Sequence, residues 1–141
     1  MVNILNSNRP ELKISKLLSL IGQPARIQII LNIGTQEICV CHLEVALGMR
    51  QASISQHLMA LRKAGLVTTY RDGRNIFYHL TNPKVVDVLR QAAQLTGCSP
   101  EALTAMTAST VRPIPGCSCP QCTPSNDPKL ICKNVSTAKS F

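Results

Sequence analysis

The chain has 141 residues, of which 45% are hydrophobic but only 3% aromatic, so a one-domain core must rest on aliphatic side chains, which favours packed helices over a β-sandwich. A formal net charge of +8 favours a polyanionic partner, because Lys and Arg release the counterions condensed on phosphates, although a merely soluble basic protein would show the same excess. No apolar run approaches the roughly 20 residues that span a bilayer, and the first residues lack a secretory-signal pattern, so we expect a cytoplasmic protein without a membrane partner.

Apolar residues at helical spacing predict two helices in the first quarter of the chain. The first covers residues 14–21, and the second covers 24–33 and begins at Pro24, because proline is favoured in the first turn of a helix. A glycine follows each helix and ends it. Residues 38–42 (Ile-Cys-Val-Cys-His) then form a short segment that favours β structure, and residues 43–47 predict a short third helix.

A fourth helix and a hairpin occupy the middle of the chain. The helix is predicted over residues 51–64, with a polar face opposite a buried stripe formed by Ile54, Leu58 and Leu61. Strands are predicted at residues 67–71 and 75–80, because Asp72-Gly73 between them is a strong turn signal. In the second strand we expect the core-facing side chains to be Ile76, Tyr78 and Leu80, alternating with Asn75, Phe77 and His79.

The last third of the chain predicts two further helices followed by a tail rich in Cys and Pro. Asn82-Pro83 is typical of a helix start and predicts a fifth helix that ends at Gly97. A further helix is predicted from Ser99 to about Ala108. We therefore expect a folded domain at residues 1–97, an extra helix within 98–110 and a tail rich in Cys and Pro at 111–141.

Two short helices joined by a tight turn, with a polar face on the second, describe a helix-turn-helix. Such a recognition helix must bury one stripe for rigidity and present short polar side chains to the edges of DNA bases. The candidate DNA contacts are Gln51, Ser53, Ser55, Gln56, His57 and Arg62 on the helix, and Arg71 and Arg74 beside the hairpin tip. The alternative is a solvated helix face next to an ordinary hairpin.

Four segments together resemble the ArsR/SmtB family of repressors. They are residues 51–67 (QASISQHLMALRKAGLV), the hairpin 70–80 (YRDGRNIFYHL), Pro24-Ala25-Arg26, and residues 38–43 (ICVCHL), which are similar to the arsenic-sensor form of the segment before the helix-turn-helix. The likeness runs from about residue 12 to residue 95.

The resemblance implies a mainly α fold with a small β-hairpin wing, a winged helix-turn-helix. It further implies a homodimeric repressor that leaves double-stranded operator DNA when an inducer binds. In this family the first and last core helices usually form the dimer interface, which here are the stripes at residues 14–21 and 85–95. Without the resemblance these stripes would simply be core.

Five of the seven cysteines are candidate metal ligands: Cys39, Cys41, Cys117, Cys119 and Cys122. Clustered thiolates select soft or borderline ions, so the expected inducer is arsenite or antimonite, cadmium, lead or zinc. Cys39 and Cys41 alone cannot complete a trigonal or tetrahedral site. In the arsenic sensors that the segment resembles, a third Cys can lie one turn further on, where this chain has Glu44. The tail could supply the missing sulfur, within one chain or across the dimer. Some family members bind zinc through the last core helix, but this helix has Asp87 and no His.

Other roles for the thiols remain open. The tail can bind zinc structurally with Cys132 as a fourth ligand, or the thiols can form a redox or persulfide switch, for instance by pairing Cys41 with Cys98 or with a tail cysteine. Cys98 and Cys132 can be incidental, and Cys39 can be a small buried side chain. His42 is a weaker candidate ligand, and His79 is expected on the strand surface.

Two other classes of protein compete with a repressor. A thiol enzyme is disfavoured because the sequence lacks a Cys-x-x-Cys motif at a helix start, a Gly-rich phosphate loop and a credible acid–base pair. A metal-storage protein would suit the tail but not the helix-turn-helix. The sequence therefore predicts no enzymatic activity.

Overall fold

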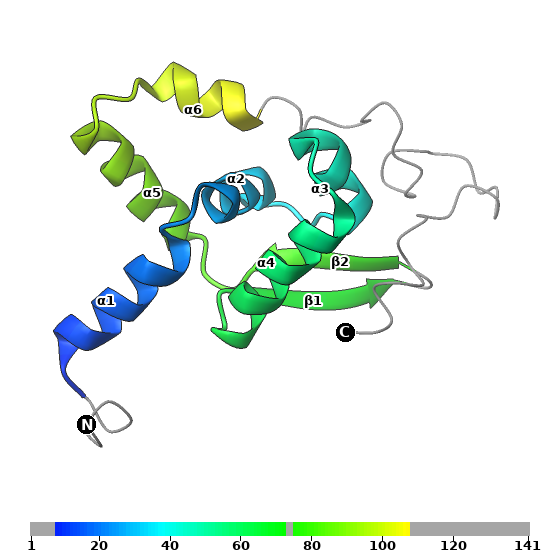
Figure 1. The fold of residues 1–141 in the computed structure, drawn as a ribbon, viewed down its shortest axis with the longest axis horizontal. Coiled ribbons are helices and arrows are strands. Elements are labelled where there is room, and N and C mark those ends of the chain that lie inside the picture. Colours follow the sequence, from blue (N-terminus) through cyan, green and yellow to red (C-terminus); the bar gives the residue numbers. More distant parts are fainter. Residues whose placement is uncertain (1–7, 73–74, 108–141) are drawn as a thin grey trace.

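The computed structural model describes residues 8–72 and 75–107 (Figure 1). Within these residues a two-stranded antiparallel hairpin follows four helices and precedes two more. The elements are α1 (Pro10–Ile21), α2 (Pro24–Ile33), α3 (Val40–Leu47), α4 (Gln51–Lys63), β1 (Val67–Asp72), β2 (Asn75–Leu80), α5 (Lys84–Leu95) and α6 (Pro100–Thr107). The mainly α winged-helix fold predicted from the sequence is confirmed.

The helix boundaries follow the proline and glycine signals. Pro24 opens α2 as predicted, and Pro10 opens α1 four residues before the predicted start. Gly34 ends α2 with a φ of 53°, a backbone conformation that side chains with a Cβ rarely adopt. The Asn82 side chain accepts a hydrogen bond from the Lys84 N–H at 3.0 Å, but α5 begins at Lys84 with Pro83 as its N-cap, one residue later than predicted.

The segment before the helix-turn-helix differs from the prediction. We expected β structure over residues 38–42, but only Ile38 forms a β-bridge, with Tyr78, and α3 already begins at Val40. Val40 and Leu43 lie three residues apart and are both buried in the core. Helical spacing brings both side chains to the same face, so packing outweighs the β-preference of the local sequence.

The hairpin pairs β1 and β2 from Val67 opposite Leu80 to Asp72 opposite Asn75. Tyr78 and Leu80 are buried, as predicted from the alternation, but Ile76 is only partly buried and Asn75, expected to face outward, is 6% exposed. Phe77 is also buried, with 2% exposure, although we expected it to face outward. Its ring stacks on that of Tyr70 with centroids 5.4 Å apart, so this face of the hairpin has an aromatic pair that the alternation did not reveal.

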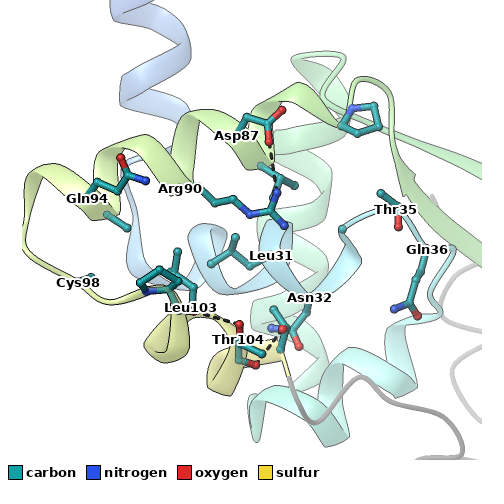
Figure 2. A pocket seen from close by; sticks show the side chains of 16 residues that line it. Leu31, Asn32, Thr35, Gln36, Asp87, Arg90, Gln94, Cys98, Leu103 and Thr104 are labelled. Carbon is teal, nitrogen blue, oxygen red and sulfur yellow. Dashed lines mark hydrogen bonds and ion pairs between the residues drawn. The ribbon is translucent and has the colours of Figure 1, made fainter.

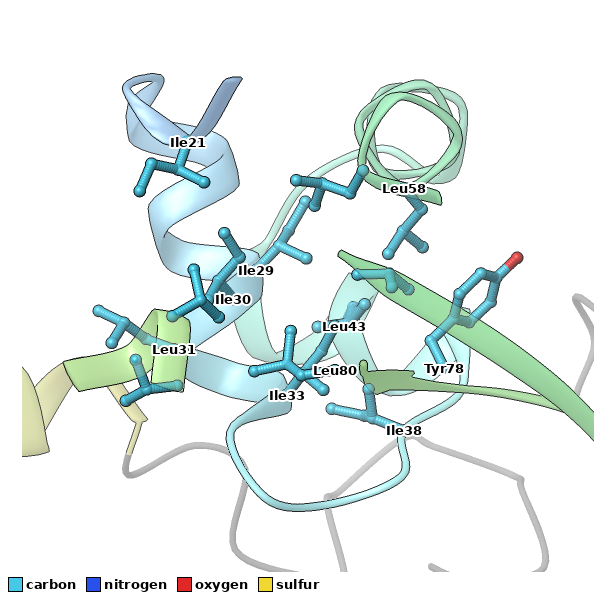
Figure 3. Close-up of a cluster of buried hydrophobic side chains, with 14 of the residues drawn as sticks. Ile21, Ile29, Ile30, Leu31, Ile33, Ile38, Leu43, Leu58, Tyr78 and Leu80 are labelled. Carbon is cyan, nitrogen blue, oxygen red and sulfur yellow. The ribbon is translucent and has the colours of Figure 1, made fainter. Parts of the chain in front are cut away.

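The core is built around α2, which contacts α3, α4, α5, α6 and β2. Ile29, Ile30 and Ile33 of this helix are completely buried. Figure 3 shows them among side chains from α4 and the hairpin. The predicted α4 stripe is confirmed, since Ile54, Leu58 and Leu61 are at most 1% exposed. None of the helices in residues 8–72 and 75–107 combines the length and apolar character that crossing a membrane requires.

Candidate nucleic-acid interface and thiol site

Helices α3 and α4 form the helix-turn-helix (Figure 1). The turn between them depends on Gly48, whose φ of 62° lies in the left-handed region and whose N–H bonds to the Glu44 carbonyl at 2.9 Å. The buried stripe of α4 anchors the helix from behind. The opposite face of α4 is therefore held in a fixed orientation toward solvent.

The structure places the predicted contacts on α4 at different depths. Ser53, Gln56 and Arg62 are exposed, and Gln51 is partly exposed. The Ser55 hydroxyl is buried and has no hydrogen-bond partner among the described residues. Ser53 and Gln56 lie three residues apart and share one face of the helix, so they can reach adjacent base edges together.

His57 is fixed by a residue from another helix. The Arg26 Nε–H of α2 donates a hydrogen bond to His57 Nδ1 at 3.3 Å, and an Arg26 Nη1–H donates to the Leu20 carbonyl at 2.9 Å. Because arginine can only donate, Nδ1 must be the acceptor, and the ring proton lies on Nε2. Burial, and to a lesser extent the Arg26 charge, lower the pKa of His57 below its usual 6.5.

We therefore expect His57 to be neutral at pH 7, with an imidazole midpoint below 6.5 in an NMR titration of the unbound protein. Substituting Arg26→Gln should return the His57 midpoint only part of the way toward 6.5, because burial is the larger cause of the lowered pKa and remains in the variant. A His57 midpoint at or above 6.5 in the unmodified chain would contradict this assignment.

The wing brings the second set of candidate contacts. Arg71 is exposed near the end of β1. Arg74, the other predicted contact, lies outside the described residues. The Tyr70 hydroxyl donates a hydrogen bond to a carboxylate oxygen of Glu37 at 2.5 Å. This bond links the wing to the loop that precedes α3.

The first cysteine pair lies at the start of the helix-turn-helix. Cys39 occupies the N-cap of α3, and Cys41 lies in its first turn. Both side chains are buried, with exposures of 1% and 8%, and their sulfurs are 3.0 Å apart. The neighbouring Ile38 exchanges two backbone hydrogen bonds with Tyr78 of β2, at 2.9 and 2.7 Å. The two sulfurs therefore lie where the helix-turn-helix and the wing strand meet.

The other cysteines do not complete this site within the described residues. No group of three or more His, Cys, Asp or Glu side chains there is placed to hold a metal ion. Cys117, Cys119, Cys122 and Cys132 lie outside the described residues. Cys41 takes part in a disulfide bond, and Cys98 is an exposed free thiol, so the structure does not pair Cys41 with Cys98.

Sequence reasoning missed two residues that position the candidate contacts. Arg26 fixes His57, and Glu37 holds the wing through Tyr70. Arg26 belongs to the Pro-Ala-Arg segment that carried part of the family resemblance. The sequence therefore singled out this residue, but it did not indicate that His57 is its hydrogen-bond partner. His79 lies on β2, where its Nε2 is 2.6 Å from the Thr68 hydroxyl.

Comparison with known proteins assigns these features to one family. Residues 23–69 match the model of the bacterial regulatory protein, arsR family. The chain is 35% identical over 89 residues to a biofilm growth-associated repressor of Agrobacterium fabrum, which covers 63% of this chain and 75% of that protein. It is also 35% identical over 82 residues to the HTH-type transcriptional repressor SmtB of Mycobacterium tuberculosis, of which it spans 61%.

A solved structure shares the arrangement of the elements. HlyU from Vibrio cholerae matches with a TM-score of 0.57 and 29% sequence identity, over 63% of this chain and 97% of that chain. The likeness covers nearly the whole of the solved protein. The helix-turn-helix and wing described above therefore belong to a recurring fold of regulators.

Proposed function

Because this chain belongs to the ArsR/SmtB family of winged-helix transcriptional repressors, we propose that a soft metal or metalloid ion releases it from operator DNA by binding cysteine thiolates. The observation that carries the proposal is the pair of sulfurs, Cys39 and Cys41, 3.0 Å apart at the start of α3. Thiolates favour trivalent arsenic or antimony, cadmium, lead and zinc.

Once the disulfide bond of Cys41 is reduced, the cysteine pair fits part of such a site. A zinc–sulfur bond is about 2.3 Å long, so two sulfurs on one tetrahedral ion lie about 3.8 Å apart. The Cys39 and Cys41 sulfurs, 3.0 Å apart, would therefore have to separate slightly to share an ion. At least one more ligand is needed. We propose that Cys117, Cys119 or Cys122 supplies it, from the same chain or from the second subunit. Burial of Cys39 and Cys41 means that ion binding requires a local opening at the start of α3.

The proposed active form is a homodimer. Four large apolar side chains are exposed on the two helices that the family resemblance assigns to the interface: Ile14 and Leu18 on α1, and Val88 and Leu95 on α5. Leu95 is 90% exposed, and covering such residues is favourable because apolar surface leaves water. A two-fold dimer would read a nearly palindromic operator, with half-sites about 34–36 Å or more apart.

The position of the sulfurs provides a physical link to DNA. In the proposed DNA-bound state, α3 packs against the recognition helix α4, and the Ile38–Tyr78 bridge holds the wing. Drawing the sulfurs onto an ion would move the start of α3 relative to both. A coupling free energy of about 1–3 kcal/mol would weaken operator binding by about 5- to 150-fold.

The proposal can be tested with the full chain and DNA from its own upstream region. Under reducing, chelated conditions the protein should shift this DNA in a gel in preference to random competitor. Adding arsenite, cadmium, lead or zinc should release the DNA in parallel with a thiolate absorbance change. Loss of DNA binding with no absorbance change, or binding of an ion with no effect on DNA, would contradict the proposal.

A thiol redox or persulfide switch on the same fold is the second candidate. It is favoured by one observation, which is that Cys41 takes part in a disulfide bond. In that case diamide, which removes two hydrogen atoms from a pair of thiols to leave a disulfide, should release the DNA without any ion. Release by ions but not by diamide would exclude this candidate.

The wing should contribute through backbone phosphates. Substituting Arg71→Gln should weaken binding to operator and random DNA equally and reduce the salt slope by about one unit, because one phosphate contact is lost. Fluorescence anisotropy over a range of salt concentrations would measure this. Arg9→Gln is the matched control, since Arg9 is an exposed arginine of α1's N-cap, remote from the wing. An unchanged slope for Arg71→Gln would count against a phosphate contact.

A further inference from the structure

A pocket of about 500 Å³ opens between α2, α5 and α6, away from Cys39, Cys41 and the recognition helix, with Cys98 in its wall (Figure 2). Its volume lies within the range of about 300–1,000 Å³ that is usual for small-molecule sites. Leu31, Val86 and Leu103 provide apolar wall, one from each helix. Both α5 and α6, which follows it in the chain, pack against α2, and the pocket lies between these three helices.

One buried side chain in the pocket wall, Asn32, has a hydrogen-bond acceptor without a donor among the described residues. Asn32 is 1% exposed, and its Nδ2 donates to the Gln28 carbonyl at 2.7 Å, yet its Oδ1 is buried without a hydrogen-bond partner among the described residues. Leaving a buried acceptor without a partner destabilises the folded state. A ligand that brings a hydrogen-bond donor would remove this cost.

A charged pair lies on the α5 side of the same pocket. Arg90 Nη1 is 3.3 Å from Asp87 Oδ1, and both side chains are about two-thirds exposed, at 63% and 66%. Exposed pairs of this kind contribute little to stability, so the guanidinium can turn to a carboxylate at small cost. Figure 2 shows Arg90 extending from α5 toward Leu31, and Asn32 near Thr104 of α6 in this view; both residues line the pocket.

We propose that this pocket binds a small carboxylic acid with a hydrogen-bond donor on its α-carbon and an apolar side chain, that is, an α-amino or α-hydroxy acid. The carboxylate pairs with Arg90, the ammonium or hydroxyl donates to Asn32 Oδ1, and the side chain packs against Leu31 and Leu103. The inference depends neither on the thiol chemistry nor on DNA binding.

The pocket and the proposed dimer interface use different faces of α5. Val86, Arg90 and Gln94 line the pocket and follow one another at intervals of four residues, so they form one stripe. Val88 and Leu95 lie seven residues apart on another stripe, which is exposed. A ligand can therefore occupy the pocket in the dimer.

Calorimetry on the full chain without DNA tests the ligand class with four matched probes. L-Phenylalanine and L-3-phenyllactate carry both groups, 3-phenylpropionate lacks the donor, and phenethylamine lacks the carboxylate. We expect one or both of the first two to bind about tenfold or more tightly than the last two, because each of these lacks one charge-assisted or buried hydrogen bond. The stronger of the first two identifies the amino or the hydroxy acid.

Variants tie the binding to this pocket. Arg90→Gln should weaken the best probe about tenfold or more, and Ala93→Phe should abolish binding by filling the pocket that Ala93 lines. Arg9→Gln, which removes another exposed and paired arginine, should leave binding unchanged. Equal binding of all four probes, no binding at millimolar concentration, or full binding by both pocket variants would overturn the inference.

Discussion

A chain carrying Cys39→Ser and Cys41→Ser is expected to bind operator DNA and to remain bound when the inducing ion is added. Neither residue belongs to the face of α4 that would meet DNA, so binding should be retained. Serine keeps the size of the side chain but is a poor ligand for soft ions. The 5- to 150-fold release that corresponds to about 1–3 kcal/mol of coupling should therefore disappear.

Two controls separate this effect from damage to the fold. Cys39 is 1% exposed, and a buried hydroxyl without a partner costs about 1–3 kcal/mol, so the melting temperature must be measured alongside DNA binding. Cys98→Ser changes an exposed free thiol and should leave both binding and release intact. Full release of the double variant by the ion would place the sensing site elsewhere in the chain.

The sequence predicted the helices and strands well because they carry strong local signals. Proline and glycine mark the limits of α2, and the two predicted strands pair as far as Asp72 opposite Asn75. The error at residues 38–42 has a tertiary origin, since only the surrounding core shows that Val40 and Leu43 must be buried on one side. Phe77 is a similar case, because its stacking on Tyr70 involves a residue of the neighbouring strand.

The candidate site was predicted in its residue types but not in its geometry. Sequence spacing placed Cys39 and Cys41 beside the helix-turn-helix, but not the bridge from Ile38 to the wing. It also could not show that the Ser55 hydroxyl is buried or that His57 is held by Arg26, because both depend on how α4 packs against the other helices.

The role of the recognition helix should appear most clearly in the ratio of the protein's affinity for operator DNA to its affinity for random DNA. Ser53→Ala and Gln56→Ala each remove an exposed polar group, and a lost base contact costs about 1–3 kcal/mol of discrimination. Surface substitutions of this kind usually change stability by less than about 0.5 kcal/mol, so the fold should persist. Operator affinity should fall by about 5- to 150-fold per contact, while affinity for random DNA should change little.

The reason for this asymmetry is that phosphate contacts attract any duplex, whereas base contacts distinguish one duplex from another. Gln28→Ala, on an exposed position of α2 away from α4's polar face, is the matched control and should leave the ratio unchanged. If affinity fell equally for operator and random DNA, Ser53 and Gln56 would contact phosphates and not bases. If neither affinity changed, the polar face of α4 would not meet DNA, and the proposed release mechanism would lose the element on which it acts.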